Sequence, residues 1–169
     1  MVGAVAAVAM AVVGCTSVIG GTPRANTADA PAYRSSIAAS EVTSSIRETE
    51  RQRAMTTQAV MGACDSFASS SRDTIAAVNK YVEAFNHDGD IAATASDAVD
   101  ALNRSADDVS ADVNDKLTAE LKDAFSAYAD AARELANAIS AKAPVPVYNA
   151  RKDDLNRARE KGIQLCTDF

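Results

Sequence analysis

The sequence predicts an all-α protein, an up-down antiparallel four-helix bundle with an extended N-terminal helical arm. Alanine, the strongest helix former, makes up about a fifth of the chain, whereas Trp is absent and aromatic residues account for only 5%, so residues that favour strands are scarce. From Tyr33 onward, apolar residues recur at steps of three and four positions, which is the period of a helix. The connections between these periodic segments are short, and short connections place consecutive helices antiparallel.

The first fourteen residues, MVGAVAAVAMAVVG, are uncharged and almost wholly apolar, and we expect residues 1–14 to be a signal peptide. As a helix they would span about 20 Å, which is well short of the roughly 30 Å hydrocarbon core of a bilayer. Export signals begin with a positively charged segment, yet the first basic residue here is Arg24. We therefore expect the true start of translation to lie upstream of Met1.

The apolar run ends in Val12-Val13-Gly14-Cys15, which resembles the lipobox of bacterial lipoproteins: two aliphatic or small residues, then Gly or Ala, then Cys. The resemblance implies that a diacylglyceryl group is attached to the Cys15 thiol and that this residue becomes the N-terminus after cleavage. An uncleaved membrane anchor and an ordinary buried cysteine are the alternatives. Residues 15–32 combine Gly and Pro with Ser, Thr and Ala, the composition of a flexible tether between lipid and fold.

We expect residues 33–169 to form the helical domain, with an arm over residues 33–61 and the bundle over residues 62–169. In the arm, apolar residues are widely spaced among charged ones, so its inward face is poorly defined. An isolated helix of this kind is only marginally stable in water. The arm is therefore either a polar helical stalk or a segment that breaks near Gly62 and folds back on the bundle.

The first helix is expected to end at Asn86, with Gly89 as its C-terminal cap, and a second helix should run from Asp90 to about Asp115. The predicted inward face of the first helix consists of Cys64, Phe67, Ser71, Ile75, Val78, Val82 and Phe85. The inward face of the second helix consists of Val99, Leu102, Ala106, Val109 and Val113.

The third helix has the clearest period, from Leu117 to Ile139, and we expect Pro144 and Pro146 to end it. Its predicted inward face consists of Leu117, Leu121, Phe125, Tyr128, Ala132, Leu135 and Ile139. The fourth helix is expected from about Tyr148 to Leu165, with Leu155, Ala158, Gly162 and Leu165 inward.

The chain contains three cysteines, Cys15, Cys64 and Cys166. If Cys15 carries lipid, the other two form an even pair in an oxidising compartment, and such a pair is usually a disulfide. In the predicted topology, Cys64 lies about 33 Å along the first helix from its end at Asn86, and Cys166 lies about 27 Å along the fourth helix from its start at Tyr148, which puts both at nearly the same height. Two buried free thiols are the alternative.

Composition and motifs argue against several classes of function. A net charge of −6 and an isoelectric point near 4.7 disfavour nucleic acid as a partner, because an acidic surface repels phosphate. The sequence has no nucleophile motif, no phosphate-binding glycine loop and no paired carboxylates within an apolar stripe. The only histidine, His87, lies in a turn and is expected to serve helix capping. We therefore expect no enzyme activity, no metal and no other cofactor.

Acidic residues are concentrated on the second helix, where Arg104 is the only basic residue. Such a cluster holds a cation, faces a basic partner or, most commonly, forms a solvated face. Its members are Asp97, Asp100, Asp107, Asp108, Asp112 and Asp115.

The lipobox, tether, polar helix and cysteine pair together resemble uncharacterised mycobacterial exported lipoproteins. The resemblance implies a protein anchored by lipid to the cell membrane and facing the extracytoplasmic side. We expect a non-enzymatic binding or structural role, with an envelope protein as a partner. A small carrier of an apolar ligand or lipid is the first alternative, but close packing of small Ala-rich stripes would leave little of the roughly 300 Å³ that a ligand pocket needs. An enzyme of unknown type is the second alternative.

Overall fold

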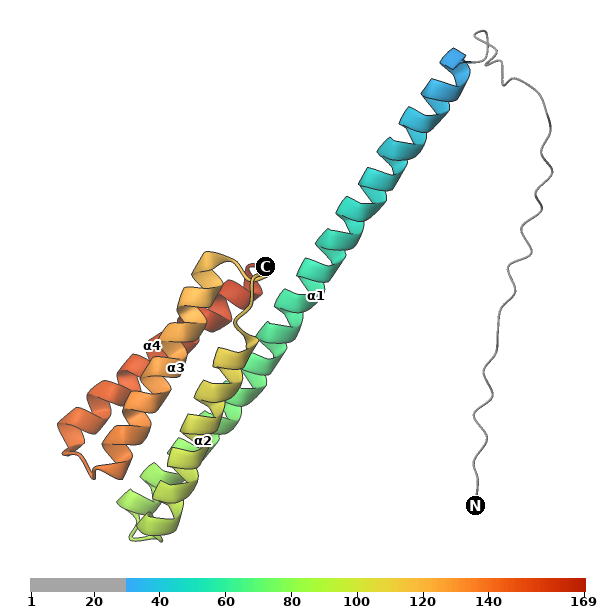
Figure 1. The fold of residues 1–169 in the computed structure, drawn as a ribbon. Helices are drawn as coiled ribbons and strands as arrows, with labels where there is room; N and C mark the ends of the chain where they lie inside the picture. Colours follow the sequence, from blue (N-terminus) through green and yellow to red (C-terminus); the bar gives the residue numbers. More distant parts are fainter. Residues whose placement is uncertain (1–29) are drawn as a thin grey trace, which may run out of the picture. The chain divides into compact units, whose positions relative to one another are not determined.

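The computed structural model describes residues 30–169, in which four helices follow one another without any strand (Figure 1). They are α1 (Ala30–Asn86), α2 (Ile91–Asp112), α3 (Ala119–Ser140) and α4 (Val145–Thr167). The predicted all-α four-helix bundle is confirmed. The signal peptide, Cys15 and most of the tether lie outside the described residues. The chain divides into two units that meet between Ser44 and Ser45, within α1, and the bundle belongs to the second unit.

Helix α1 passes through Gly62 without a break, so the predicted alternative of a break at this residue is wrong. A glycine inside a helix costs only about 1 kcal/mol relative to alanine, and this is too little to interrupt a helix whose neighbouring turns are packed. Packing of α1 begins at Val60, which is buried. Residues 31–44 of the first unit and residues 45–55 of the second are all exposed.

Helix α3 supplies the largest share of the core, because one broad face of it is buried along its whole length. Phe67 of α1 packs between two α3 aromatics: its ring stacks on Phe125 with centroids 4.7 Å apart and meets Tyr128 edge-on at 4.9 Å. Gly162 of α4 lies against the Phe67 ring as well. A Cβ atom at position 162 would come within 2.6 Å of the Phe67 ring, so only glycine fits there.

A short polar seam runs through the packed faces of α1, α2 and α3. The Ser70 hydroxyl donates to the Ser105 hydroxyl (2.7 Å), which in turn shares a hydrogen bond with the Tyr128 hydroxyl (2.9 Å). Thr74 donates to the carbonyl oxygen of Ala101 on α2 (3.3 Å). Thr74 is buried although the apolar period of α1 does not include it. Paired in this way, the hydroxyl groups avoid the cost of burial without a partner.

The turn after α1 differs from the prediction, because Asp88 rather than Gly89 adopts the left-handed conformation (φ 52°). Gly89 instead follows the left-handed residue, and its N–H donates to the Ala84 carbonyl oxygen (2.9 Å). Aspartate tolerates positive φ because its side chain is short and polar. Glycine is still favoured at position 89, since a Cβ atom there would lie 3.1 Å from the Ala84 Cα atom.

The two prolines after α3 begin α4 instead of only ending α3. Pro144 is the N-cap residue of α4 and Pro146 lies in its first turn, so α4 starts at Val145, earlier than predicted. Proline is favoured in the first turn of a helix because its missing N–H has no helical partner there. Helix α3 is ended by Lys142, which adopts a left-handed conformation (φ 50°), and the next N–H donates back to the Ala138 carbonyl oxygen (2.9 Å).

Candidate binding groove at one end of the bundle

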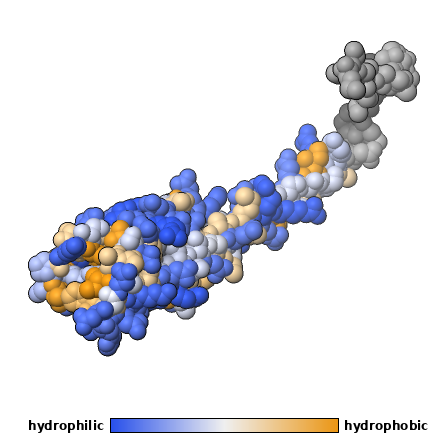
Figure 2. Space-filling model, turned by 90° about the horizontal axis from the view of Figure 1, so that it is seen from below, coloured by the Kyte–Doolittle hydropathy of each residue, from blue (hydrophilic) through white to orange (hydrophobic). Residues whose placement is uncertain are grey.

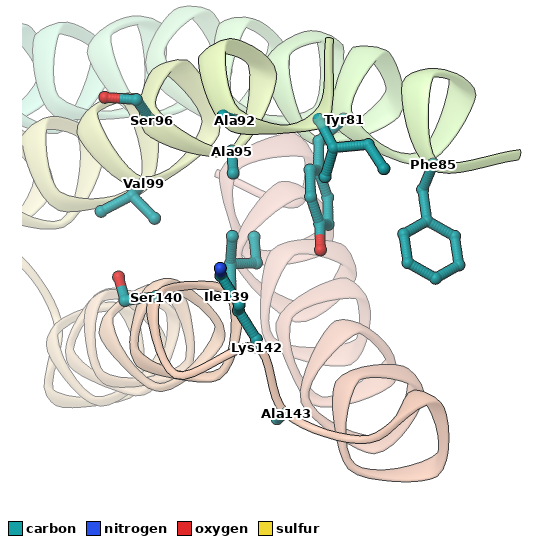
Figure 3. Close-up of a pocket in the computed structure, with 11 residues that line it drawn as sticks. Tyr81, Phe85, Ala92, Ala95, Ser96, Val99, Ile139, Ser140, Lys142 and Ala143 are labelled. Atoms are coloured by element: carbon teal, nitrogen blue, oxygen red, sulfur yellow. The ribbon is translucent and has the colours of Figure 1, made fainter. Parts of the chain in front are cut away.

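A groove of about 600 Å³ lies at the end of the bundle where the α1–α2 and α3–α4 connections are found (Figure 3). Helices α1, α2 and α3 and the α3–α4 connection all contribute to it. Its larger apolar side chains are Tyr81, Phe85, Ile91, Val99 and Ile139. Alanine side chains of α2 lie opposite α3 here, and their small size leaves the space open.

A second hollow of about 220 Å³ adjoins the groove and shares Tyr81 and Phe85 with it. Its other boundary is formed by Val145 and Tyr148 at the start of α4. The Tyr81 and Tyr148 rings meet edge to face, with centroids 5.9 Å apart. Tyr81 is therefore a common wall between two neighbouring hollows.

The apolar side chains at this end are unusually accessible. Phe85 is 52% exposed, so its predicted inward position is wrong. Ile91, Val145 and Val147 are exposed as well, and Figure 2 shows apolar side chains gathered on the surface at this end of the bundle. Adjoining exposed apolar residues of this size commonly mark a binding site.

Lys142 is the only charged residue that lines either hollow. No ion pair joins it to another residue within 30–169. Its backbone is fixed by the left-handed conformation at the end of α3 and by a hydrogen bond from its N–H to the Ile139 carbonyl oxygen (3.0 Å). Figure 3 shows the Lys142 side chain extending beside Ile139 at the edge of the groove. The site therefore combines an apolar surface with one positive charge.

The Tyr148 hydroxyl is buried and has no hydrogen-bond partner among the described residues. Burial raises the pKa of this phenol from 10 to about 12, because the ionised form would lose its hydration. An unpaired buried hydroxyl is costly to the folded state.

Of the predicted site residues, Cys15 lies outside the described residues, whereas Cys64 and Cys166 form a disulfide between α1 and α4. Their Cα atoms are 5.6 Å apart. The structure thus pairs the same two cysteines as the sequence prediction. Cys64 lies about 30 Å along α1 from Phe85, which places the disulfide and the groove at opposite ends of the bundle.

The other candidate residues lie away from the groove lining. His87 is exposed in the α1–α2 connection, where its N–H donates to the Glu83 carbonyl oxygen (3.0 Å). The aspartates of α2 are mostly exposed, and Asp107 forms an ion pair with Arg133 of α3 (3.0 Å). The described part of the chain contains no group of three side chains suited to hold a metal ion.

Comparison with known proteins identifies the bundle. The model of the Rv2240c four-helix bundle domain matches residues 46–167. The chain belongs to this family. The match to the Rv2240c four-helix bundle family includes both disulfide cysteines and all residues of the groove. The chain is also similar to uncharacterized protein MT2300 of Mycobacterium tuberculosis (strain CDC 1551 / Oshkosh), with 46% identity over 168 residues, covering 97% of this chain and 86% of that protein.

No solved structure matches the chain. Within residues 30–169, none of the helices is both long enough and apolar enough to cross a membrane.

The sequence prediction missed the groove. Close packing of small side chains was expected to leave too little space for a ligand, but the groove is about 600 Å³ in volume. Alanines pack the helices closely in the middle of the bundle, whereas Ala92 and Ala95 line the groove at its end. One signal was present in the sequence, since Phe85, Ile91 and Val145 are large apolar residues placed directly beside turns.

Proposed function

We propose that this member of the Rv2240c four-helix bundle family is an exported lipoprotein, anchored to the extracytoplasmic side of the cell membrane through Cys15, with a bundle that acts by binding and not by catalysis. The apolar groove with its single lysine is the observation that carries the binding role. The lipobox at Cys15, directly after an uncharged apolar segment, supports the anchor.

The side chains of the groove support a non-enzymatic role. Its polar members are a phenol, two serine hydroxyls and the amino group of Lys142. Nucleophilic catalysis needs a base within hydrogen-bonding reach of the nucleophile; no carboxylate or imidazole lines the groove, and no hydrogen bond is found between Lys142 and either serine of its lining. Apolar contact and charge pairing are what these residues offer a partner.

The partner that we propose first is another protein of the envelope. A carrier of a small apolar molecule is the second candidate, and the volume of the groove favours it. Ligand pockets occupy about 300–1,000 Å³, and the groove falls within that range. Both candidates use the same surface, so they are separated by what occupies it.

Intact mass measurement on protein isolated from its own host tests the anchor. We expect the mature chain to begin at Cys15, to carry a diacylglyceryl group and to sediment with the membrane. A Cys15→Ala variant should lose the lipid and stay uncleaved, keeping the apolar segment 1–14, whereas the nearby substitution Ser17→Ala should leave cleavage and lipidation intact. An unmodified Cys15 in the native protein would contradict the proposal.

Photo-crosslinking from the groove tests the binding role. A photoreactive amino acid at position 85 should capture one envelope protein in living cells, whereas the same residue at position 116, in the connection at the other end of the bundle, should not. A bound small molecule seen by native mass spectrometry, without crosslinked protein, would favour the carrier. Equal labelling from positions 85 and 116, with no bound molecule, would contradict a binding role for the groove.

A further inference from the structure

We propose that the groove binds the anion of a long-chain fatty acid, with the chain along the apolar lining and the carboxylate paired with Lys142. The inference rests on the carrier, the second candidate for the proposed binding function, and names the chemical class of its occupant. It does not depend on the anchor at Cys15.

The apolar residues of the groove can contact the hydrocarbon chain of a fatty acid. Tyr81 and Phe85 on α1 face Ile139 and Ala143 across the groove, and Val99 of α2 extends the apolar surface along its length. Tyr81 also borders the second hollow, which Tyr148 lines as well. A largely apolar surface suits a flexible hydrocarbon chain better than a compact polar molecule, because contact removes apolar area from water on both partners.

Lys142 can form an ion pair with the carboxylate head group. It is the single charge in the lining, and no ion pair within residues 30–169 neutralises it. Lys142 is exposed, and Figure 3 shows its side chain beside Ile139. A head group paired with it would stay in contact with water while the hydrocarbon chain is buried. In a protein with a net charge of −6, one unpaired ammonium group beside an apolar surface selects an acidic amphiphile over a basic one.

The test uses the mature chain, residues 15–169, carrying Cys15→Ala, so that neither an attached lipid nor the apolar segment 1–14 competes for the groove. Three probes share a sixteen-carbon chain with a photoreactive diazirine and differ in the head group: hexadecanoate, hexadecanol and hexadecyltrimethylammonium. Each is used below its micelle-forming concentration, and the crosslinked peptides are mapped. We expect hexadecanoate to crosslink to residues 81–99 and 139–149 and to bind more tightly than either other probe.

Charge removal tests the head group. Lys142→Asn should weaken hexadecanoate binding about fivefold, the effect of losing one partly exposed ion pair, and should leave hexadecanol binding unchanged. Asparagine is chosen because it accepts the left-handed backbone, so the connection keeps its conformation. Lys142→Arg should keep the affinity, and Lys116→Asn at the other end of the bundle serves as the matched control.

Filling the groove with a large side chain tests whether the hydrocarbon chain of the probe binds there. Ala92 lines the groove and is exposed, so Ala92→Trp should abolish crosslinking without disturbing the core. Its neighbour Ala93 is also exposed but lies outside the lining, and Ala93→Trp should bind hexadecanoate as the unsubstituted protein does.

The outcomes separate this inference from the proposed function. Equal binding of the three probes within the groove, with no effect of Lys142→Asn, would overturn the fatty acid and leave a binding groove. Failure of every probe to crosslink there would also overturn the inference, and capture of an envelope protein from position 85 would then still support the proposed function. Failure of both experiments would overturn both.

Discussion

The contact between Gly162 and Phe67 leaves no room for a side chain at position 162. Gly162→Ala would force the Phe67 ring away from Phe125, so we expect it to lower the free energy of unfolding by about 1–3 kcal/mol. Gly62 provides the matched control, because it also lies inside a helix but has open space around its Cα atom.

Gly62→Ala should raise the free energy of unfolding by up to about 1 kcal/mol, through helix propensity alone. Urea unfolding of the two variants measures the difference. Similar effects in both variants would show that the Gly162 contact does not limit packing.

Two tyrosines test the cost of an unpaired hydroxyl. Tyr128 shares a hydrogen bond with Ser105, so Tyr128→Phe should cost about 1 kcal/mol of unfolding free energy. The Tyr148 hydroxyl has no partner among the described residues, so Tyr148→Phe should be neutral or stabilising. Denaturant unfolding of both variants gives the comparison. A large loss of stability in Tyr148→Phe would mean that this hydroxyl has a partner in solution.

The raised pKa of Tyr148 predicts a specific loss of stability in alkali. The folded state keeps this phenol protonated up to about pH 12, whereas its pKa in the unfolded chain is near 10. Below pH 10 the phenol is neutral in both the folded and the unfolded chain, so its ionisation does not affect the free energy of unfolding. As the pH rises from 10 to 12 the phenol ionises more readily in the unfolded chain, and the free energy of unfolding falls. We expect the parent chain to be destabilised more steeply than Tyr148→Phe over this interval, as measured by urea unfolding at a series of pH values. Parallel curves would exclude a raised pKa.

At the scale of the elements, the disulfide joins α1 and α4 and closes a loop of 102 residues. Constraining a loop of this length in the unfolded chain stabilises the fold by about 4.7 kcal/mol at most, and 2–4 kcal/mol is typical. The double variant Cys64→Ala/Cys166→Ala should have a free energy of unfolding about 2–4 kcal/mol lower than that of the unsubstituted protein. Reduction of the disulfide in the unsubstituted protein should have the same effect.

Cys15→Ala is the matched control for this experiment and should leave the unfolding midpoint unchanged. Thiol titration of the unreduced, unfolded chain provides a second readout. Release of reactive thiols from Cys64 and Cys166 without a reductant would contradict the pairing.

The sequence predicted helices best where one face is buried from end to end. Helix α3 was expected from Leu117 to Ile139 and is found from Ala119 to Ser140, because its apolar period is unbroken and Thr118 caps its start by accepting the Leu121 N–H. Helix ends were predicted less well, since they depend on competition between neighbouring residues. Proline both ends helices and begins them, and periodicity alone did not show that Pro146 belongs to α4.

The groove could not be predicted from periodicity, because a period shows which face of a helix is apolar and not where its neighbours stop. Phe85 continues the inward face of α1, yet it lies in the last turn and remains exposed. Lys142 gave no signal either, since its importance comes from a turn that places it beside side chains distant in sequence. The disulfide was predictable because it follows from the number of cysteines and from the rise per residue of a helix. Neither quantity depends on how the turns at the ends of the bundle are folded.

At the scale of the whole molecule, the two ends of the bundle differ in structure. One end carries the disulfide between Cys64 and Cys166, and the other carries the groove, where the α1–α2 and α3–α4 connections join the helices in pairs. Both ends lie within the region that defines the Rv2240c four-helix bundle family, whereas Cys15 lies outside it. The proposed binding surface and the proposed anchor therefore belong to separate parts of the chain and can be altered independently.

The disulfide also determines what happens when the chain is cut. The three connections between helices, which are the natural places for proteolysis, all lie inside the loop that Cys64 and Cys166 close. A protease that cuts after Lys116 alone should yield a single band on a non-reducing gel and two bands after reduction. Separation without reductant would contradict this expectation. In the proposed anchored form, a nicked molecule would keep its C-terminal half, so an envelope protease could cut the protein without shedding it.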